Sequence, residues 1–97
     1  MDSDATAISV TRQGESAFRV EVRSAGVTTT HAVEVPEGLA DELGWSAAKE
    51  ADLVHASFSF LLEREPATSI LRQFSLDVIG RYFPEYKSEM RHVSRPT

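Results

Sequence analysis

The chain has 97 residues, a net charge of −5, 41% hydrophobic residues and no cysteine, which together predict a single globular domain with one modest core. The lack of cysteine excludes disulfides, thiolate metal sites and cysteine nucleophiles. No apolar run approaches the ~18 residues of a membrane helix, and the acidic start lacks the features of a signal peptide. We therefore expect a cytoplasmic protein with no membrane contact.

The charges are unevenly distributed along the chain. Residues 1–63 carry 4 basic and 11 acidic side chains, whereas residues 64–97 carry 6 basic and 4 acidic ones. A nucleic-acid-binding protein normally presents a basic face, which only the last third could supply, so nucleic acid is not the expected partner. Arginine outnumbers lysine, alanine is frequent and asparagine is absent, a composition typical of a GC-rich bacterial genome.

Residues 7–35 are predicted to form three strands. Apolar residues alternate with polar ones in three runs, and a period of two puts one face of a strand on a core. Breaks that contain glycine, at residues 13–15 and 24–26, predict tight turns. Three strands joined in this way form an antiparallel β-meander. The residues predicted to share its apolar face are Ile8, Val10, Phe18, Val20, Val22, His31, Val33 and Val35.

Two helices are predicted after the strands. Residues 36–43 begin with proline and are followed by Gly44. A proline at the start and a glycine just after the end are typical of a short helix. Ser46 is a plausible N-cap for a longer helix over residues 47–64. Apolar residues occupy about half the circumference of this second helix, so we expect it to contact the sheet on one side and the C-terminal helices on the other.

The C-terminal third is predicted to be helical but interrupted. Pro66 ends the long helix and can begin a short one near residues 67–73. Ser75 is the predicted N-cap of the next helix, and Pro84 forces that helix to kink or restart. An apolar stripe with alternating spacings of three and four runs through this region, formed by Leu76, Ile79, Phe83, Tyr86, Met90 and Val93.

These elements predict an α+β fold. A three-stranded antiparallel β-meander comes first, and three or four helices then pack on one face of the sheet. One domain spans residues 6–93, and residues 1–5 and 94–97 are predicted to be flexible tails.

No recognised catalytic or metal-binding pattern is present. His31, His55 and His92 match no metal-ligand spacing, and the sequence lacks both a nucleophile elbow and a glycine-rich phosphate loop. We therefore expect no enzyme activity, no metal and no cofactor, with structural or surface roles for the histidines. An enzyme would need a pocket in which His31 or His55 meets carboxylates.

The favoured function is binding of another protein or of a second copy. Aromatic and apolar residues are abundant around and beyond Pro84, and tyrosine suits interfaces because it combines an apolar ring with a polar tip. The candidate interaction surface consists of Arg81, Tyr82, Tyr86 and Met90. The competing interpretation is that the apolar stripe simply packs on the protein's own sheet.

A dimeric DNA-binding regulator of the antitoxin type is the alternative function. A strand, a proline-led helix and a longer helix within residues 33–65 resemble the ribbon-helix-helix order, in which strand side chains read the major groove. Residues 67–83 could instead form a helix-turn-helix. The acidic surroundings of the strand oppose the first arrangement beside a phosphate backbone.

Four segments of the second half resemble the C-terminal signature of a small uncharacterised bacterial protein family of about this length. They are residues 63–66 (EREP), 69–72 (SILR), 74–79 (FSLDVI) and 81–86 (RYFPEY). Together with the strand over residues 30–36, the resemblance covers most of the chain. It implies no activity, ligand or catalytic residue, since none is established for that family.

Overall fold

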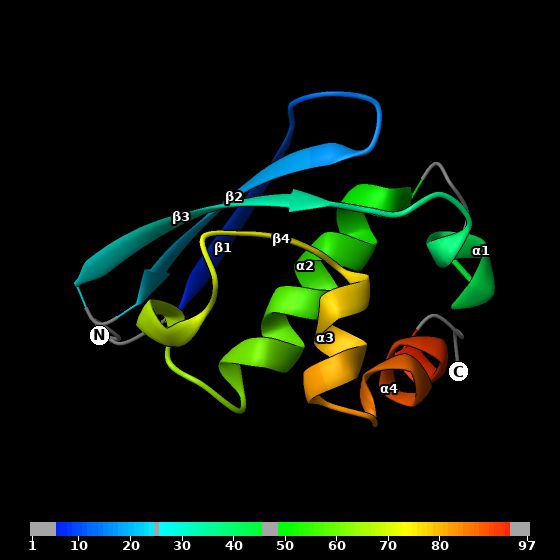
Figure 1. Cartoon of the computed structure of the whole chain (residues 1–97). Helices are drawn as coiled ribbons and strands as arrows, with labels where there is room; N and C mark the ends of the chain where they lie inside the picture. The colour runs from blue at the N-terminus through cyan, green and yellow to red at the C-terminus, as the bar shows by residue number, and fades with distance from the viewer. Residues whose placement is uncertain (1–5, 25, 46–48, 94–97) are drawn as a thin grey trace.

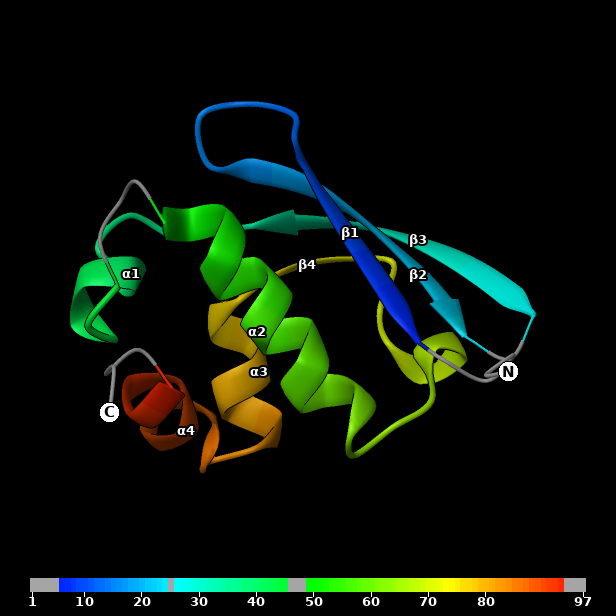
Figure 2. The same cartoon turned by 180° about the vertical axis from the view of Figure 1, so that it is seen from behind.

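The computed structural model describes residues 6–24, 26–45 and 49–93. One layer of β-sheet lies against one layer of helices (Figure 1), and the reverse view shows the same two layers (Figure 2). The α+β class predicted from the sequence is confirmed. Within the described part of the chain, no helix is long and apolar enough to cross a membrane. The predicted tails, residues 1–5 and 94–97, lie outside the described residues.

The predicted meander is present. Strands β1 (Ala7–Arg12), β2 (Ala17–Ser24) and β3 (Val27–Glu34) pair antiparallel in chain order. Gly26, beside the second turn, has a φ of 81°, a left-handed conformation that glycine adopts without a steric penalty. The register puts Val20 opposite His31 on β3, so the alternating residues of neighbouring strands lie on one face.

The predicted apolar face of the meander forms one wall of the core. Its residues on β1 are partly buried, and those on β2, on β3 and just after β3 are almost fully buried. Alternation thus identified the inward face correctly, including the one histidine in it. The fully enclosed members are Phe18, Val20, Val22, His31, Val33 and Val35.

A fourth strand extends the sheet and was not predicted. β4 (Gln73–Ser75) pairs parallel with β3 at Ala32–Glu34, giving the strand order β1-β2-β3-β4. The helix predicted near residues 67–73 is therefore wrong, since only a 3-10 helix at Ala67–Ser69 forms there. The Ala32 N–H donates to the Arg72 carbonyl at 2.7 Å, so pairing with the sheet overrides the local helical preference.

The first helix is shorter than predicted. α1 covers Leu39–Glu42 rather than residues 36–43, because Gly38 at its N-cap has a left-handed φ of 84° that a helix interior cannot contain. The end at Gly44, with a φ of 83°, is as predicted.

Helix α2 (Glu50–Leu62) is the centre of the molecule. Its Phe58 ring lies 5.2 Å from the His31 ring on the sheet, while its Phe60 ring lies 5.4 Å from Tyr86 in the last helix. The predicted two-sided packing is confirmed. The predicted cap Ser46 lies outside the described residues, and Lys49 occupies the N-cap position of the helix as described.

The chain ends in two helices, α3 (Asp77–Tyr82) and α4 (Tyr86–Val93). They are separate because Phe83 is extended, with φ −128° and ψ 93°, as expected for a residue before proline. The predicted restart at Pro84 is confirmed. Ser75 is not the N-cap of α3: it is the last residue of β4, and Leu76 takes the N-cap position without a side-chain hydrogen bond.

Candidate interaction groove

The structure divides the four residues of the predicted interaction surface into two pairs. Arg81 is exposed and Tyr82 has 69% of its surface accessible, whereas Tyr86 and Met90 are 0% and 2% exposed. The expectation that Tyr86 and Met90 lie on the surface is therefore corrected. The apolar stripe to which both belong packs into the core, and it contacts α2 rather than only the sheet.

Hydrogen bonds explain why Tyr86 can be buried. The Ser57 hydroxyl donates to the Leu53 carbonyl at 2.8 Å, so the Tyr86 hydroxyl, 2.7 Å from Ser57 Oγ, is the donor between the two side chains. Burial raises the pKa of the Tyr86 phenol to about 12, against a smaller opposing effect of the Ser57 hydrogen bond. Tyr86 thus joins α4 to α2 and offers nothing to a partner.

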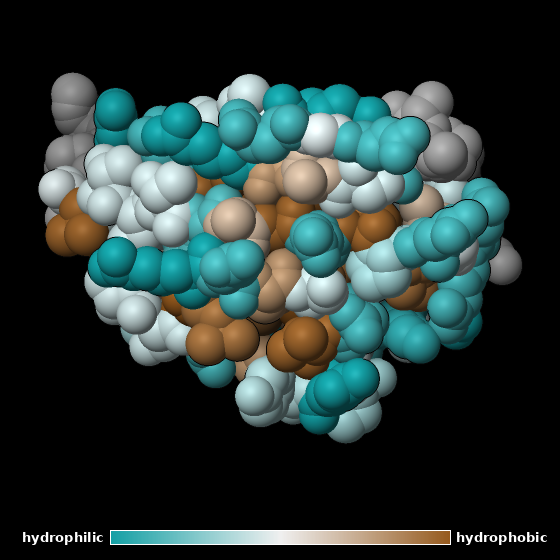
Figure 3. Space-filling model, turned by 45° about the horizontal axis from the view of Figure 1, so that its top comes forward, coloured by the Kyte–Doolittle hydropathy of each residue, from teal (hydrophilic) through white to brown (hydrophobic). Residues whose placement is uncertain are grey.

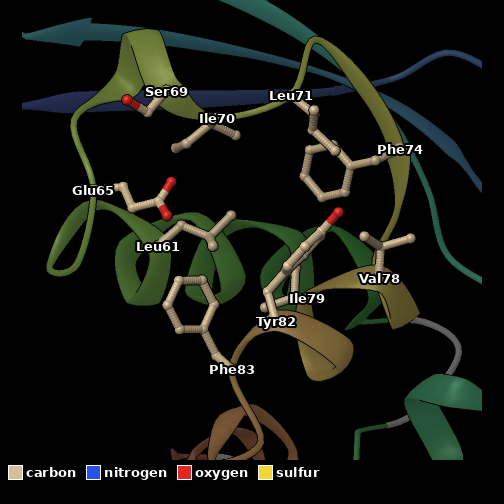
Figure 4. Close-up of a pocket in the computed structure, with 10 residues that line it drawn as sticks. All are labelled: Leu61, Glu65, Ser69, Ile70, Leu71, Phe74, Val78, Ile79, Tyr82 and Phe83. Carbon is tan, nitrogen blue, oxygen red and sulfur yellow. The ribbon is translucent and has the colours of Figure 1, made fainter.

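An apolar hollow of about 370 Å³ opens beside Tyr82, between α2, the 3-10 helix, β4 and α3. We call it the β4–α3 groove. Figure 4 shows side chains from α2, β4 and α3 turned toward it, with Ser69 of the 3-10 helix at its edge. The residues that line the groove are Leu61, Glu65, Ser69, Ile70, Leu71, Phe74, Val78, Ile79, Tyr82 and Phe83.

Exposed apolar side chains gather at this groove. Only three large apolar residues of the described chain are well exposed, and two of them, Leu71 at 52% and Tyr82 at 69%, line the groove. The third, Val27 at 49%, lies at the start of β3. Figure 3 shows apolar surface gathered at the middle of one face and surrounded by hydrophilic surface. Such a concentration is typical of a binding surface.

A buried histidine fixes one wall of the groove. His31 Nδ1 lies 2.7 Å from the Leu71 carbonyl oxygen, which can only accept, so Nδ1 carries the proton and donates. On the other side of the ring, Nε2 lies 2.9 Å from the hydroxyl of Thr29. His31 therefore has the structural role expected of it and also holds the backbone that carries Leu71.

Glu65 is the only charged residue among the ten that line the groove. Glu65 as a residue is partly buried, and its carboxylate makes no hydrogen bond or ion pair with any described residue. The neighbouring Arg64 is engaged elsewhere: its guanidinium lies 3.2 Å from Glu85 and stacks over the Phe60 ring, 3.7 Å from the centroid. The groove thus combines an apolar lining with one negative charge, which has no ion-pair partner among the described residues.

No catalytic or metal constellation forms around the histidines in the described residues. His55 is exposed on α2 and borders a separate hollow of about 360 Å³ together with Ser59 and Glu63, but no hydrogen bond joins these three side chains. His92 is exposed near the end of α4. Within the same described part, no cluster of three or more histidines and carboxylates is placed to hold a metal ion.

The geometry gives the DNA-binding alternative no support. A ribbon-helix-helix dimer pairs the strand before its first helix with the same strand of a second chain. Here β2 occupies one edge of β3, and β4 occupies residues 32–34 of the other edge. The helix-turn-helix considered as an alternative for residues 67–83 does not form, because β4 lies in its middle.

Sequence reasoning singled out Tyr82 but missed Leu71. The available signal was the pair of adjacent apolar residues Ile70 and Leu71 in an extended segment, where successive side chains point in opposite directions. The structure buries Ile70 and exposes Leu71 accordingly.

The chain matches no protein-family model, no curated protein and no solved structure. The interpretation of the groove therefore rests on its own geometry and chemistry.

Proposed function

We propose that this chain is a non-enzymatic protein-interaction module that binds through the β4–α3 groove. The observation that carries the proposal is the placement of Leu71 and Tyr82, both largely exposed, on the rim of a single apolar hollow. Isolated exposed apolar residues are ordinary on protein surfaces, whereas two that converge on one hollow indicate a binding site.

The energetics favour a protein surface as the occupant. Fully covering a large apolar side chain contributes roughly 1.5 to 3 kcal/mol, and tyrosine is among the residues that dominate interface energies. A small-molecule site encloses most of its ligand. Here the two rim residues project into solvent, and such side chains are best covered by an equally broad partner surface.

The groove is also held in a defined shape. The His31 ring holds the Leu71 carbonyl at 2.7 Å, and the rings of Phe58 and Phe74 contact each other in a tilted arrangement with centroids 5.9 Å apart. A preformed site avoids the cost of ordering its side chains when the partner binds.

A displayed library of random peptides tests the proposal. The full chain would be immobilised sparsely, so that copies do not meet, and selected peptides would be counter-screened on a variant carrying both Leu71→Glu and Tyr82→Glu. We expect enriched peptides with large apolar residues that bind the native chain and lose binding to the double variant.

Val27→Glu is the matched control, because it places the same charge on the third exposed apolar residue, away from the groove. Peptides should bind this variant as they bind the native chain. The proposal fails if the native chain is monomeric in solution and no peptide distinguishes it from the double variant.

A further inference from the structure

The Glu65 end of the β4–α3 groove is negative, and the described part of the chain supplies no cation to it. Figure 4 shows the carboxylate turned toward the hollow beside Leu61 and Ile70. These two neighbours are only 6% and 7% exposed, and the carboxylate makes no hydrogen bond or ion pair with any described residue. A carboxylate beside buried apolar groups is partly shielded from water, so a charged partner stabilises it more than in open solvent.

The end of α2 adds to this negative potential. Glu65 lies within one turn of the helix end, and its N–H donates to the Leu61 carbonyl at 2.8 Å. A helix C-terminus carries a partial negative charge that basic side chains can offset, but the last turn of α2 contains none. Arg64 bonds to the Phe60 carbonyl at 3.1 Å and to Glu85 at 3.2 Å, and it does not line the groove. A cation in the groove would thus meet both a carboxylate and the negative end of a helix.

We propose, building on the proposed function, that the β4–α3 groove binds a segment of another protein that carries an arginine among large apolar residues. The apolar side chains cover Leu71 and Tyr82, and the guanidinium pairs with Glu65. Arginine suits this place better than lysine, because its planar group bonds to both carboxylate oxygens at once and is more weakly hydrated.

The charges of the whole chain favour the same partner. A net charge of −5 attracts a basic segment and repels an acidic one. A second copy of this chain is a poorer occupant, since it carries the same net charge. None of the ten residues that line the groove is basic, so the walls of a second groove would bring no cation to Glu65.

The probes for this inference are displayed peptides that bind the native chain and fail to bind the variant with Leu71→Glu and Tyr82→Glu. We expect these peptides to share an arginine, or less often a lysine, at one position. Glu65→Gln should weaken their binding about 10-fold, because it removes the charge and keeps the shape of the side chain. The carboxylate makes no bond with any described residue, so the substitution breaks none there. Calorimetric titration at physiological salt measures the affinities.

Charge reversal gives the sharper measurement. Glu65→Lys should weaken binding of the arginine peptides about 10- to 100-fold. The same peptides with glutamate in place of the arginine should bind Glu65→Lys more tightly than they bind the native chain. Glu37→Gln and Glu37→Lys are the matched controls, because they make the same changes of net charge at an exposed acid that does not line the groove. They should change the affinity by less than about two-fold.

Three results would overturn the inference. They are selected peptides that share no basic residue, a Glu65→Gln variant that loses no more affinity than Glu37→Gln, and a native chain that forms a dimer in light scattering which Tyr82→Glu abolishes. The proposed function survives each of them, because the groove still binds through Leu71 and Tyr82. If the native chain is a monomer and no peptide distinguishes it from the double variant, both proposals fail.

Discussion

Helices α3 and α4 contain two tyrosines four residues apart that lie in opposite environments. Tyr82 ends α3 with most of its ring in solvent on the rim of the groove, whereas Tyr86 begins α4 with no accessible surface and a hydrogen bond to Ser57. In one continuous helix, residues four apart share a face. The extended Phe83 breaks that relation.

The difference shows how one proline separates an exposed tyrosine from a buried one. The restart after Pro84 changes the direction of the chain, so α4 turns its apolar side to α2 while the end of α3 keeps an aromatic residue exposed. Grouping Tyr82 with Tyr86 in one surface assumed a continuity that the proline removes.

The largest expected effect is on stability and tests the comparison directly. Tyr86→Ala should lower the free energy of unfolding by about 3 to 5 kcal/mol, because it leaves a cavity between α2 and α4. Tyr82→Ala should change it by less than about 0.5 kcal/mol. Urea denaturation followed by circular dichroism measures both. Equal losses in the two variants would contradict the division between core and surface.

A second prediction concerns the link between the core and the groove. His31→Gln removes the donor at the Nδ1 position and leaves the Leu71 carbonyl unpaired, which should cost about 1 to 3 kcal/mol. His31→Asn retains an amide donor near that position and serves as the matched variant.

Amide hydrogen exchange gives the local readout for this pair. The Ala32 N–H bonds to the Arg72 carbonyl, so it should exchange faster in His31→Gln than in His31→Asn if the imidazole holds β4 in place. Identical exchange in the two variants would mean that the sheet pairing alone fixes the segment.

Alkaline pH should lower the free energy of unfolding through the buried Tyr86. The pKa of Tyr86 is raised to about 12 in the folded protein, above the ordinary value near 10, so at alkaline pH the unfolded chain loses this proton first. The unfolded state then binds fewer protons, and the free energy of unfolding falls as pH rises from about 10 toward 12, by roughly 1 to 2 kcal/mol.

Tyr86→Phe isolates this contribution, because phenylalanine has no proton to lose. The difference in stability between the native chain and this variant should shrink as pH rises from about 10 toward 12. A pH-independent difference would show that Tyr86 titrates in the folded protein as it does in the unfolded chain.

The smallest expected effect on folding is at the groove. Leu71→Ala should alter the free energy of unfolding by less than about 0.5 kcal/mol, because the side chain is half exposed. The same substitution should nevertheless reduce binding at the groove. A large loss of stability measured by urea denaturation would indicate that Leu71 supports the core instead.

Much of the fold follows from local signals in the sequence. Alternation identified the meander and its inward face, and Gly44 and Pro84 marked real boundaries. β4 could not be predicted in the same way. Three residues are too few for a period, and the strand depends on a partner strand about 40 residues earlier in the chain.

Sequence reasoning placed Tyr82 at the surface correctly, but it also placed Tyr86 and Met90 there. The spacing of the apolar stripe had indicated that these two residues are buried. This spacing already placed Tyr86 and Met90 in register with Leu76 and Ile79, all four of which are buried. Tyr82 lies outside that spacing and is exposed. Burial was thus readable from periodicity, whereas the groove arises from β4 and needed the tertiary structure.

The parallel pairing of β3 with β4 also has a consequence for the order of folding. The meander is built from neighbouring segments, but β4 reaches β3 only after the chain has closed a loop of about 40 residues, and such distant contacts form late because their entropic cost comes first. The groove walls are completed by this step. A chain synthesised only as far as β3 therefore lacks most walls of the groove, which require the later residues 69–83.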